Sequence, residues 1–153
     1  MAHTAESVFQ MAFEEIYSSD AATWHLQFHG NATCKKDLFL SNGVAAAPAT
    51  LHALKANIEA ASTAAAAGGL VLKADVCDAT DDCDLRGMDN MQMRFASGLP
   101  HASICPDGNV PVGPSRFIHV EQRRDARRAP TDPMATPGRN RGVVVAGILA
   151  TFP

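Results

Sequence analysis

The chain has 153 residues, of which 46% are hydrophobic, and its formal net charge is -3. This length and composition suffice for one domain with one hydrophobic core, so no second domain is needed. The slightly acidic balance and the absence of a basic stripe exclude a nucleic-acid partner, because the arginines at positions 123, 124, 127 and 128 form one short run of the kind found on a solvated helix face.

The amino-terminal segment has no basic stretch followed by an apolar one, as a signal peptide would. No stretch of the chain reaches the roughly 20 apolar residues of a membrane helix. As written, the sequence therefore predicts a soluble, cytoplasmic protein with no membrane partner. Its oligomeric state is not indicated by any pattern.

The cysteines are sparse and match no Cys-x-x-Cys pattern of zinc or redox sites. They are Cys34, Cys77, Cys83 and Cys105. Cys77 and Cys83 flank a polar turn. They could form a local disulfide in an oxidising compartment, and the alternative is that both thiols are reduced.

Four short segments predict β-strands, because they are rich in apolar residues and end near turn residues. They are residues 23–29, 37–41, 70–76 and 116–121. Helices are predicted over residues 5–18, with Thr4 as N-cap, and over residues 48–66. Strands that alternate with helices predict an α/β fold with a mixed, mostly parallel sheet flanked by helices.

Each predicted helix has apolar residues at helical spacing. In the first helix these are Phe9, Phe13 and Ile16, and in the second they are the buried stripe Leu51, Leu54 and Ile58, with Gly68-Gly69 after it.

Residues 77–115 predict a long loop with a short element near 90–95, and loops of this length are usually functional or disordered. A short arginine-rich helix is expected after the last strand. We expect an α/β domain over residues 1–128, a Pro- and Gly-rich linker over 129–141, and an apolar element over 142–153 that packs on the domain. The valines of this last element favour a strand and its alanines a helix.

Two strand segments carry ionisable side chains on one face. Side chains alternate along a strand, so His25, Gln27 and His29 point away from the apolar residues between them, and His119 shares a face with Glu121. An open α/β sheet presents ligands and bases at the carboxyl ends of its strands. This pattern predicts a metal-assisted hydrolase.

His3 and Glu6 have the spacing that places two side chains on one face of a helical turn. With His29 they would supply three zinc ligands and leave a fourth position for water, and Glu121 would accept the proton of that water as general base. A second reading is that His3 and Glu6 are only solvated. Arg123 follows Glu121 by two positions and is a candidate substrate-binding residue.

The remaining histidines have weaker patterns. His25 either orients a ligand or packs in the core. His119 either tunes Glu121, contacts substrate or packs. We expect His52 to face solvent, and His101 lies in a loop without a pattern.

Several segments resemble the later portion of the N-formylglutamate amidohydrolase-like proteins. They are residues 2–10, 25–30, 37–43, 87–94 and 117–122. These proteins are similar in fold to the zinc carboxypeptidases, so the resemblance implies a zinc carboxypeptidase-like fold with His29 as zinc ligand and Glu121 as general base. It also implies that Asn90 and Arg94 bind the carboxylate of a substrate, for which an amide beside a guanidinium is suited.

In that superfamily an earlier strand and loop supply the first metal ligands, and this chain begins after them. Either His3 and Glu6 substitute for those ligands, or the metal site is incomplete. The long proteins of this family are often exported, so the resemblance leaves export open as a second reading in case the front end is missing. Arg94 also has a second reading, a surface pair with Asp84 or Asp89.

The sequence thus predicts a zinc-dependent hydrolase that cleaves an amide bond in a small N-acyl amino acid or peptide. The alternative is a truncated, inactive hydrolase-like domain that serves as a binding module.

Overall fold

The computed structural model describes residues 7–20, 22–31, 36–43, 48–66, 71–76, 90–104, 115–123, 126 and 137–153. Its four described strands form one sheet in the order β1-β4-β2-β3. The strands are β1 (His25–Asn31), β2 (Leu38–Ser41), β3 (Ala74–Val76) and β4 (Phe117–Arg123). β1 pairs with β4 in parallel, β2 pairs with β3 in parallel, and β2 pairs with β4 antiparallel. The predicted α/β fold with a mixed sheet is confirmed.

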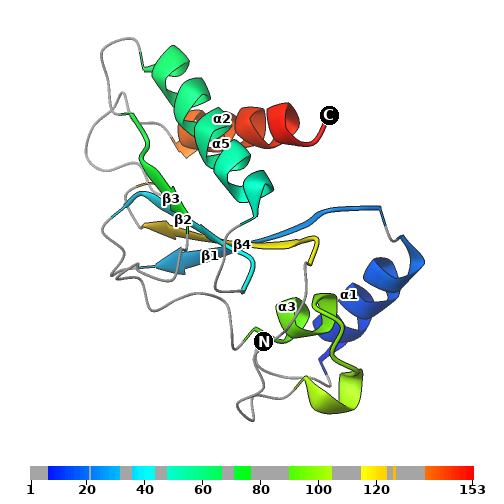
Figure 1. Ribbon diagram of the computed structural model, residues 1–153. Helices are drawn as coiled ribbons and strands as arrows, with labels where there is room; N and C mark the ends of the chain where they lie inside the picture. The colour runs from blue at the N-terminus through cyan, green and yellow to red at the C-terminus, as the bar shows by residue number, and fades with distance from the viewer. Residues whose placement is uncertain are drawn as a thin grey trace.

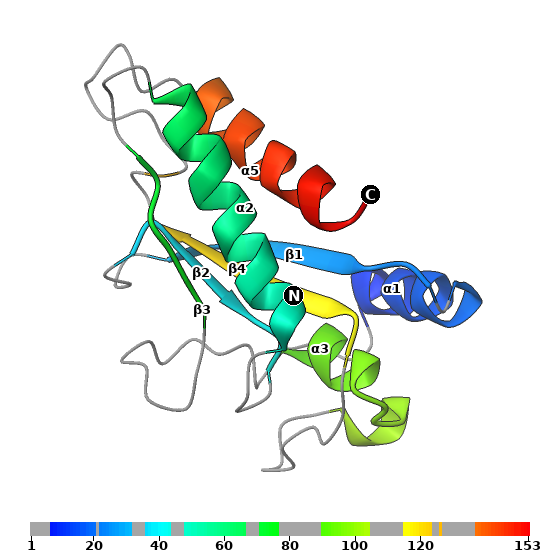
Figure 2. The same ribbon diagram turned by 45° about the horizontal axis from the view of Figure 1, so that its top comes forward.

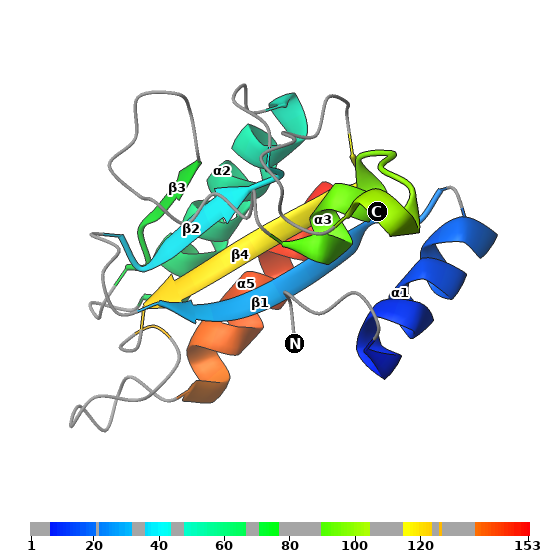
Figure 3. The same ribbon diagram turned by 90° about the horizontal axis from the view of Figure 1, so that it is seen from below.

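Helices lie on both sides of this sheet (Figure 1). Helix α2 (Ala49–Ala65) and helix α5 (Pro137–Thr151) pack against each other over one face, as Figure 2 also shows. Helix α1 (Val8–Ser19) and helix α3 (Met91–Ala96) lie on the other side, near the amino-terminal ends of β1 and β4 (Figure 3). The 3-10 turn η1 (His101–Ser103) follows α3. No helix within the described ranges has the length and apolar character needed to cross a membrane.

The main hydrophobic core lies between the sheet and the pair α2 and α5. The sheet contributes Leu38, Leu40, Ala74, Val76, Ile118 and Val120, and the helices contribute Leu51, Leu54, Ile58, Val143 and Val144. The predicted stripe of α2 is therefore confirmed. Because residues that alternate with these core residues along β1 and β4 must point to the other face, the polar side chains of both strands gather on the side of α1 and α3.

Helix α1 differs from its prediction in both its start and its buried face. It begins after Ser7, whose side chain accepts a hydrogen bond from Gln10 N at 3.1 Å, and Thr4 lies outside the described residues. Phe9 and Ile16 are exposed, whereas Gln10 is buried. Of the predicted residues, Phe13 does pack inward, with Tyr17, against Met93, Ala96 and Phe117. The Tyr17 hydroxyl also donates to Ala96 O at 3.0 Å.

The carboxyl-terminal element is a helix, and α5 starts at Pro137, inside the segment predicted as a linker. Proline suits the first position of a helix because its fixed φ is already helical and its missing N–H would have no partner there. Val143 and Val144 are buried against α2, so tertiary packing outweighs the β preference of the valines. From the sequence alone, helix and strand were both open for residues 142–153, and the structure shows a helix.

Strand β3 is shorter than predicted, since residues 71–73 are not part of it, whereas β4 extends to Arg123. The short element predicted near residues 90–95 is confirmed as α3. The four cysteines, Gly68-Gly69 and most of the predicted arginine-rich helix lie outside the described residues.

Candidate metal centre

His29, His119 and Glu121 form a cluster on the polar face of the sheet. His29 is the register partner of Glu121 across the β1 and β4 pair, and His119 precedes Glu121 by two positions on β4. His119 Nε2 lies 3.4 Å from Glu121 Oε1, and the ring centroids of His29 and His119 are 4.6 Å apart. One ligand atom from each of the three residues lies within 4.8 Å of the others.

The position of β4 explains why this cluster is buried. β4 has β1 on one side and β2 on the other, so its side chains have neighbours on both flanks. On β2, Phe39 is the register partner of Glu121, and Ser41 is the register partner of His119. His119 and Glu121 are each only 4% exposed. A charged and a titratable side chain are thus held in a site largely removed from water.

Burial determines the protonation state of His119. Desolvation, and then the nearby charge of His29, lower the pKa of His119 to about 4. The ring is therefore neutral at neutral pH, which is the form that binds a metal ion. Its Nδ1 atom is buried and has no hydrogen-bond partner within the described part of the chain. The ring can therefore accept one further interaction.

One pair of donor atoms in the cluster has the spacing of two ligands of a zinc ion. Zinc ligands in proteins are imidazole nitrogens and carboxylate oxygens at about 2.0–2.2 Å, and two such atoms around a tetrahedral ion are roughly 3.4 Å apart. The separation of His119 Nε2 and Glu121 Oε1, 3.4 Å, matches this spacing. Two histidines and one glutamate are also a ligand set of catalytic zinc sites that leave a fourth position open.

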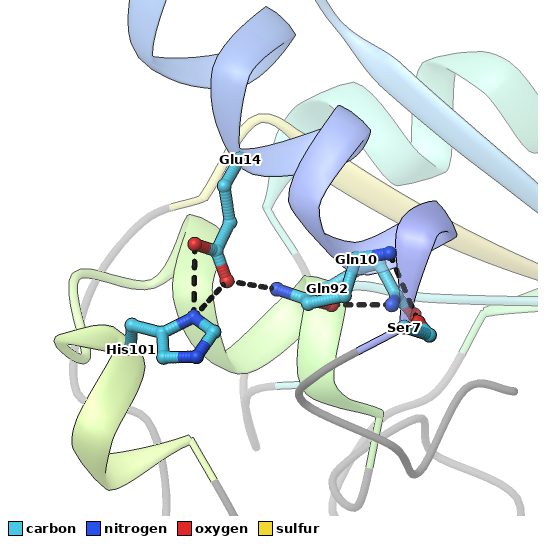
Figure 4. Close-up of polar contacts among 5 residues, drawn as sticks. All are labelled: Ser7, Gln10, Glu14, Gln92 and His101. Atoms are coloured by element: carbon cyan, nitrogen blue, oxygen red, sulfur yellow. Dashed lines mark hydrogen bonds and ion pairs between the residues drawn. The ribbon is translucent and has the colours of Figure 1, made fainter.

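A chain of buried and half-buried amides begins on β1 beside the cluster and runs to the helices. Gln27, the register partner of His119, donates from Nε2 to Gln92 Oε1 at 3.2 Å. Gln92 Nε2 donates to Gln10 Oε1, and Gln10 Nε2 donates to Glu14 Oε1 at 2.6 Å. Figure 4 shows this part of the chain, which continues to the surface through Glu14 and His101, 2.7 Å apart. The network joins β1, α3, α1 and η1.

Asn90 belongs to the same network. Its Oδ1 accepts from Met93 N at 3.2 Å and caps α3, and its Nδ2 donates to Gln27 Oε1. These bonds position α3 against β1. Asn90 is buried, and both the oxygen and the nitrogen of its side-chain amide form hydrogen bonds within the protein.

The two predicted substrate-binding arginines have different surroundings. Arg94 is only 2% exposed, so it does not lie on the surface, and Asp84 and Asp89 lie outside the described residues. Arg123 is at the end of β4, partly exposed, two positions after Glu121. Alternation along the strand places Arg123 on the same face as Glu121.

Among the predicted metal ligands, the structure brings His29 next to Glu121, whereas His3 and Glu6 lie outside the described residues. The sequence did not identify His119 as a metal ligand, although its shared face with Glu121 was visible. The missing information was the pairing of β4 with β1, which brings both residues to His29.

The other histidines are also placed by the structure. His52 is exposed, as predicted. His25 packs on the rings of Phe13 and Tyr17, with centroids 5.2 and 5.0 Å away, which agrees with its core reading. Desolvation lowers the pKa of His25. His101, for which the sequence had no pattern, contacts Glu14 of α1.

No family model, no curated protein and no solved structure matches this chain.

Proposed function

We propose that this chain is a zinc-dependent hydrolase that cleaves an amide bond in a small N-acyl amino acid or peptide, in the manner of the N-formylglutamate amidohydrolase-like and carboxypeptidase-like proteins. The observation that carries the proposal is the cluster of His29, His119 and Glu121, with ligand atoms within 4.8 Å of one another. Its position at the carboxyl-terminal half of two parallel strands suits a substrate crevice.

In this proposal His29 and His119 hold the metal through imidazole nitrogens. Zinc in such a site lowers the pKa of a bound water toward about 7 and polarises a carbonyl oxygen. Glu121 is 3.4 Å from His119, the spacing of two ligands of one ion. Glu121 therefore either completes the ligand set or, as the family resemblance implies, accepts a proton as general base.

In this proposal the substrate carboxylate binds to the arginines. Arg94 of α3 is only 2% exposed, so it would act from beneath the surface, and Arg123 follows Glu121 on the same strand face and is partly exposed. A guanidinium binds a carboxylate through two parallel hydrogen bonds. Asn90, whose amide is engaged by Gln27 and Met93, supports this region by holding α3 in place.

Metal content is the first test. Protein purified without chelator or metal-affinity tag is offered zinc, dialysed and measured by elemental analysis. We expect about one zinc per chain, lost in both His29→Ala and His119→Ala. His52→Ala is the matched control, since His52 is exposed on α2, on the other side of the sheet. Absence of zinc from the unchanged protein would overturn the metal site.

The reaction is tested with a panel of N-formyl and N-acetyl amino acids, following release of the amine. We expect zinc-dependent turnover that is lost in Glu121→Gln. If that variant keeps its zinc, Glu121 is the base, and if it loses zinc, Glu121 is a ligand. Bound zinc without turnover on any substrate of the panel would favour the inactive binding module instead.

A further inference from the structure

A cavity lies on the opposite face of the sheet from the candidate metal centre, between β1, β2 and α5. Its volume is about 490 Å³, within the range of about 300–1,000 Å³ typical of small-molecule sites. Its apolar walls are Phe28, Leu38, Leu72, Val144 and Val145. Phe28 and Val145 are 46% and 47% exposed, so the cavity opens to solvent beside two large apolar side chains. Apolar surface left open in this way is typical of a binding site.

One part of the cavity wall is polar and basic. Gln122, Asn140 and Arg141 line it, and among the described residues of the lining none is acidic. Asn140 and Arg141 belong to the early turns of α5, which starts at Pro137 and has no acidic residue in its first turn. Asn140 is buried and its Nδ2 donates to Ala126 O at 3.0 Å, so its amide is part of the wall. The cavity therefore combines the Arg141 cation with an apolar interior.

We propose that this cavity binds a small monocarboxylic acid with an apolar chain. The chain would lie against Phe28 and Val145, and the carboxylate would pair with Arg141. A single arginine matches one carboxylate. This binding site is independent of the proposed hydrolase activity, because Phe28 and Gln122 point to the face of the sheet opposite to His29 and Glu121.

The test is isothermal titration calorimetry with decanoate as the probe. We expect saturable binding with one decanoate per chain. Val145→Trp fills the cavity and should abolish binding at concentrations that saturate the unchanged protein. Leu149→Trp is the matched control, because Leu149 is on the same helix, 66% exposed, and does not line the cavity. Circular dichroism verifies that both variants are folded.

A second variant examines the carboxylate. Arg141→Gln replaces an exposed side chain, so folding should be unaffected. It should weaken decanoate binding about fivefold and leave the binding of decanol, the uncharged analogue, unchanged. Absence of saturable decanoate binding, equal binding by Val145→Trp and Leu149→Trp, or loss of binding in His29→Ala would each overturn the proposal.

Discussion

His119 is a residue that must stay neutral to remain buried. Desolvation lowers its pKa to about 4 in the folded protein, whereas the unfolded chain has the ordinary pKa of 6.5. Below pH 6.5 the unfolded chain binds a proton at this ring and the folded protein does not, so stability is lost as pH falls from 6.5 to about 4. One pKa unit corresponds to about 1.4 kcal/mol, so this ring contributes a loss of roughly 3 kcal/mol over the whole window.

We expect the free energy of unfolding of the metal-free protein to fall more steeply between neutral pH and about pH 5 than that of His119→Gln. The measurement is urea unfolding in the presence of a chelator, with His52→Gln as control because His52 is exposed. Parallel pH profiles for the unchanged protein and His119→Gln would contradict the assignment of a buried neutral ring.

Residue patterns predicted only part of the candidate site. Strand alternation was enough to place His119 and Glu121 on one face, because that relation depends on neighbours in the chain. The approach of His29 to Glu121 depends on the pairing of β1 with β4, whose residues are far apart in sequence. The sequence therefore had no means of choosing His119 over His3 and Glu6 as the partner of His29.

At the scale of elements, the crossing of α2 and α5 depends on one glycine. A Cβ atom built at Gly147 would lie 2.8 Å from Ile58 N and Cα, and closer still to Ile58 Cγ1. Backbone atoms of α2 cannot move aside as a side chain can. The absence of a side chain at Gly147 therefore permits the two helices to approach closely.

We expect Gly147→Ala to lower the free energy of unfolding by about 1–3 kcal/mol, the usual cost of overpacking. Gly142→Ala on the same helix has no atom within 4 Å of its new Cβ. It should raise stability by roughly 0.5–1 kcal/mol, because alanine is the better helix former. Chemical unfolding of both variants tests this, and equal effects of the two substitutions would contradict the close approach.

The packing of α5 on α2 also explains why the sequence alone did not decide between helix and strand for this segment. Its local composition favours a strand and a helix about equally, since its valines favour a strand and its alanines a helix. Val143 and Val144 meet α2 only in the folded protein. Helix α2 itself was predicted correctly, because Leu51, Leu54 and Ile58 repeat at helical spacing within one segment.

At the scale of the whole molecule, the two faces of the sheet carry different groups of side chains. The apolar face and the pair α2 and α5 form the main core, while the polar face carries the candidate metal centre. Metal removal should therefore lower stability without unfolding the protein.

We expect zinc at about 100 times its dissociation constant to stabilise the fold by about 2.7 kcal/mol. For a domain of this size that is roughly 5–10 °C in Tm. The shift, measured by differential scanning calorimetry with and without chelator, should disappear in His29→Ala and His119→Ala and persist in His52→Ala. A circular dichroism spectrum of an unfolded chain after chelation would show instead that the core depends on the metal.

Local periodicity by itself determined the α/β class, the stripe of α2 and the opposite faces of the strands, because each of these follows from residues a few positions apart. Only the tertiary structure decided the strand order, the helical state of α5 and the meeting of His29 with His119 and Glu121. These features arise from contacts between distant segments, whose free energy is absent until the chain has folded.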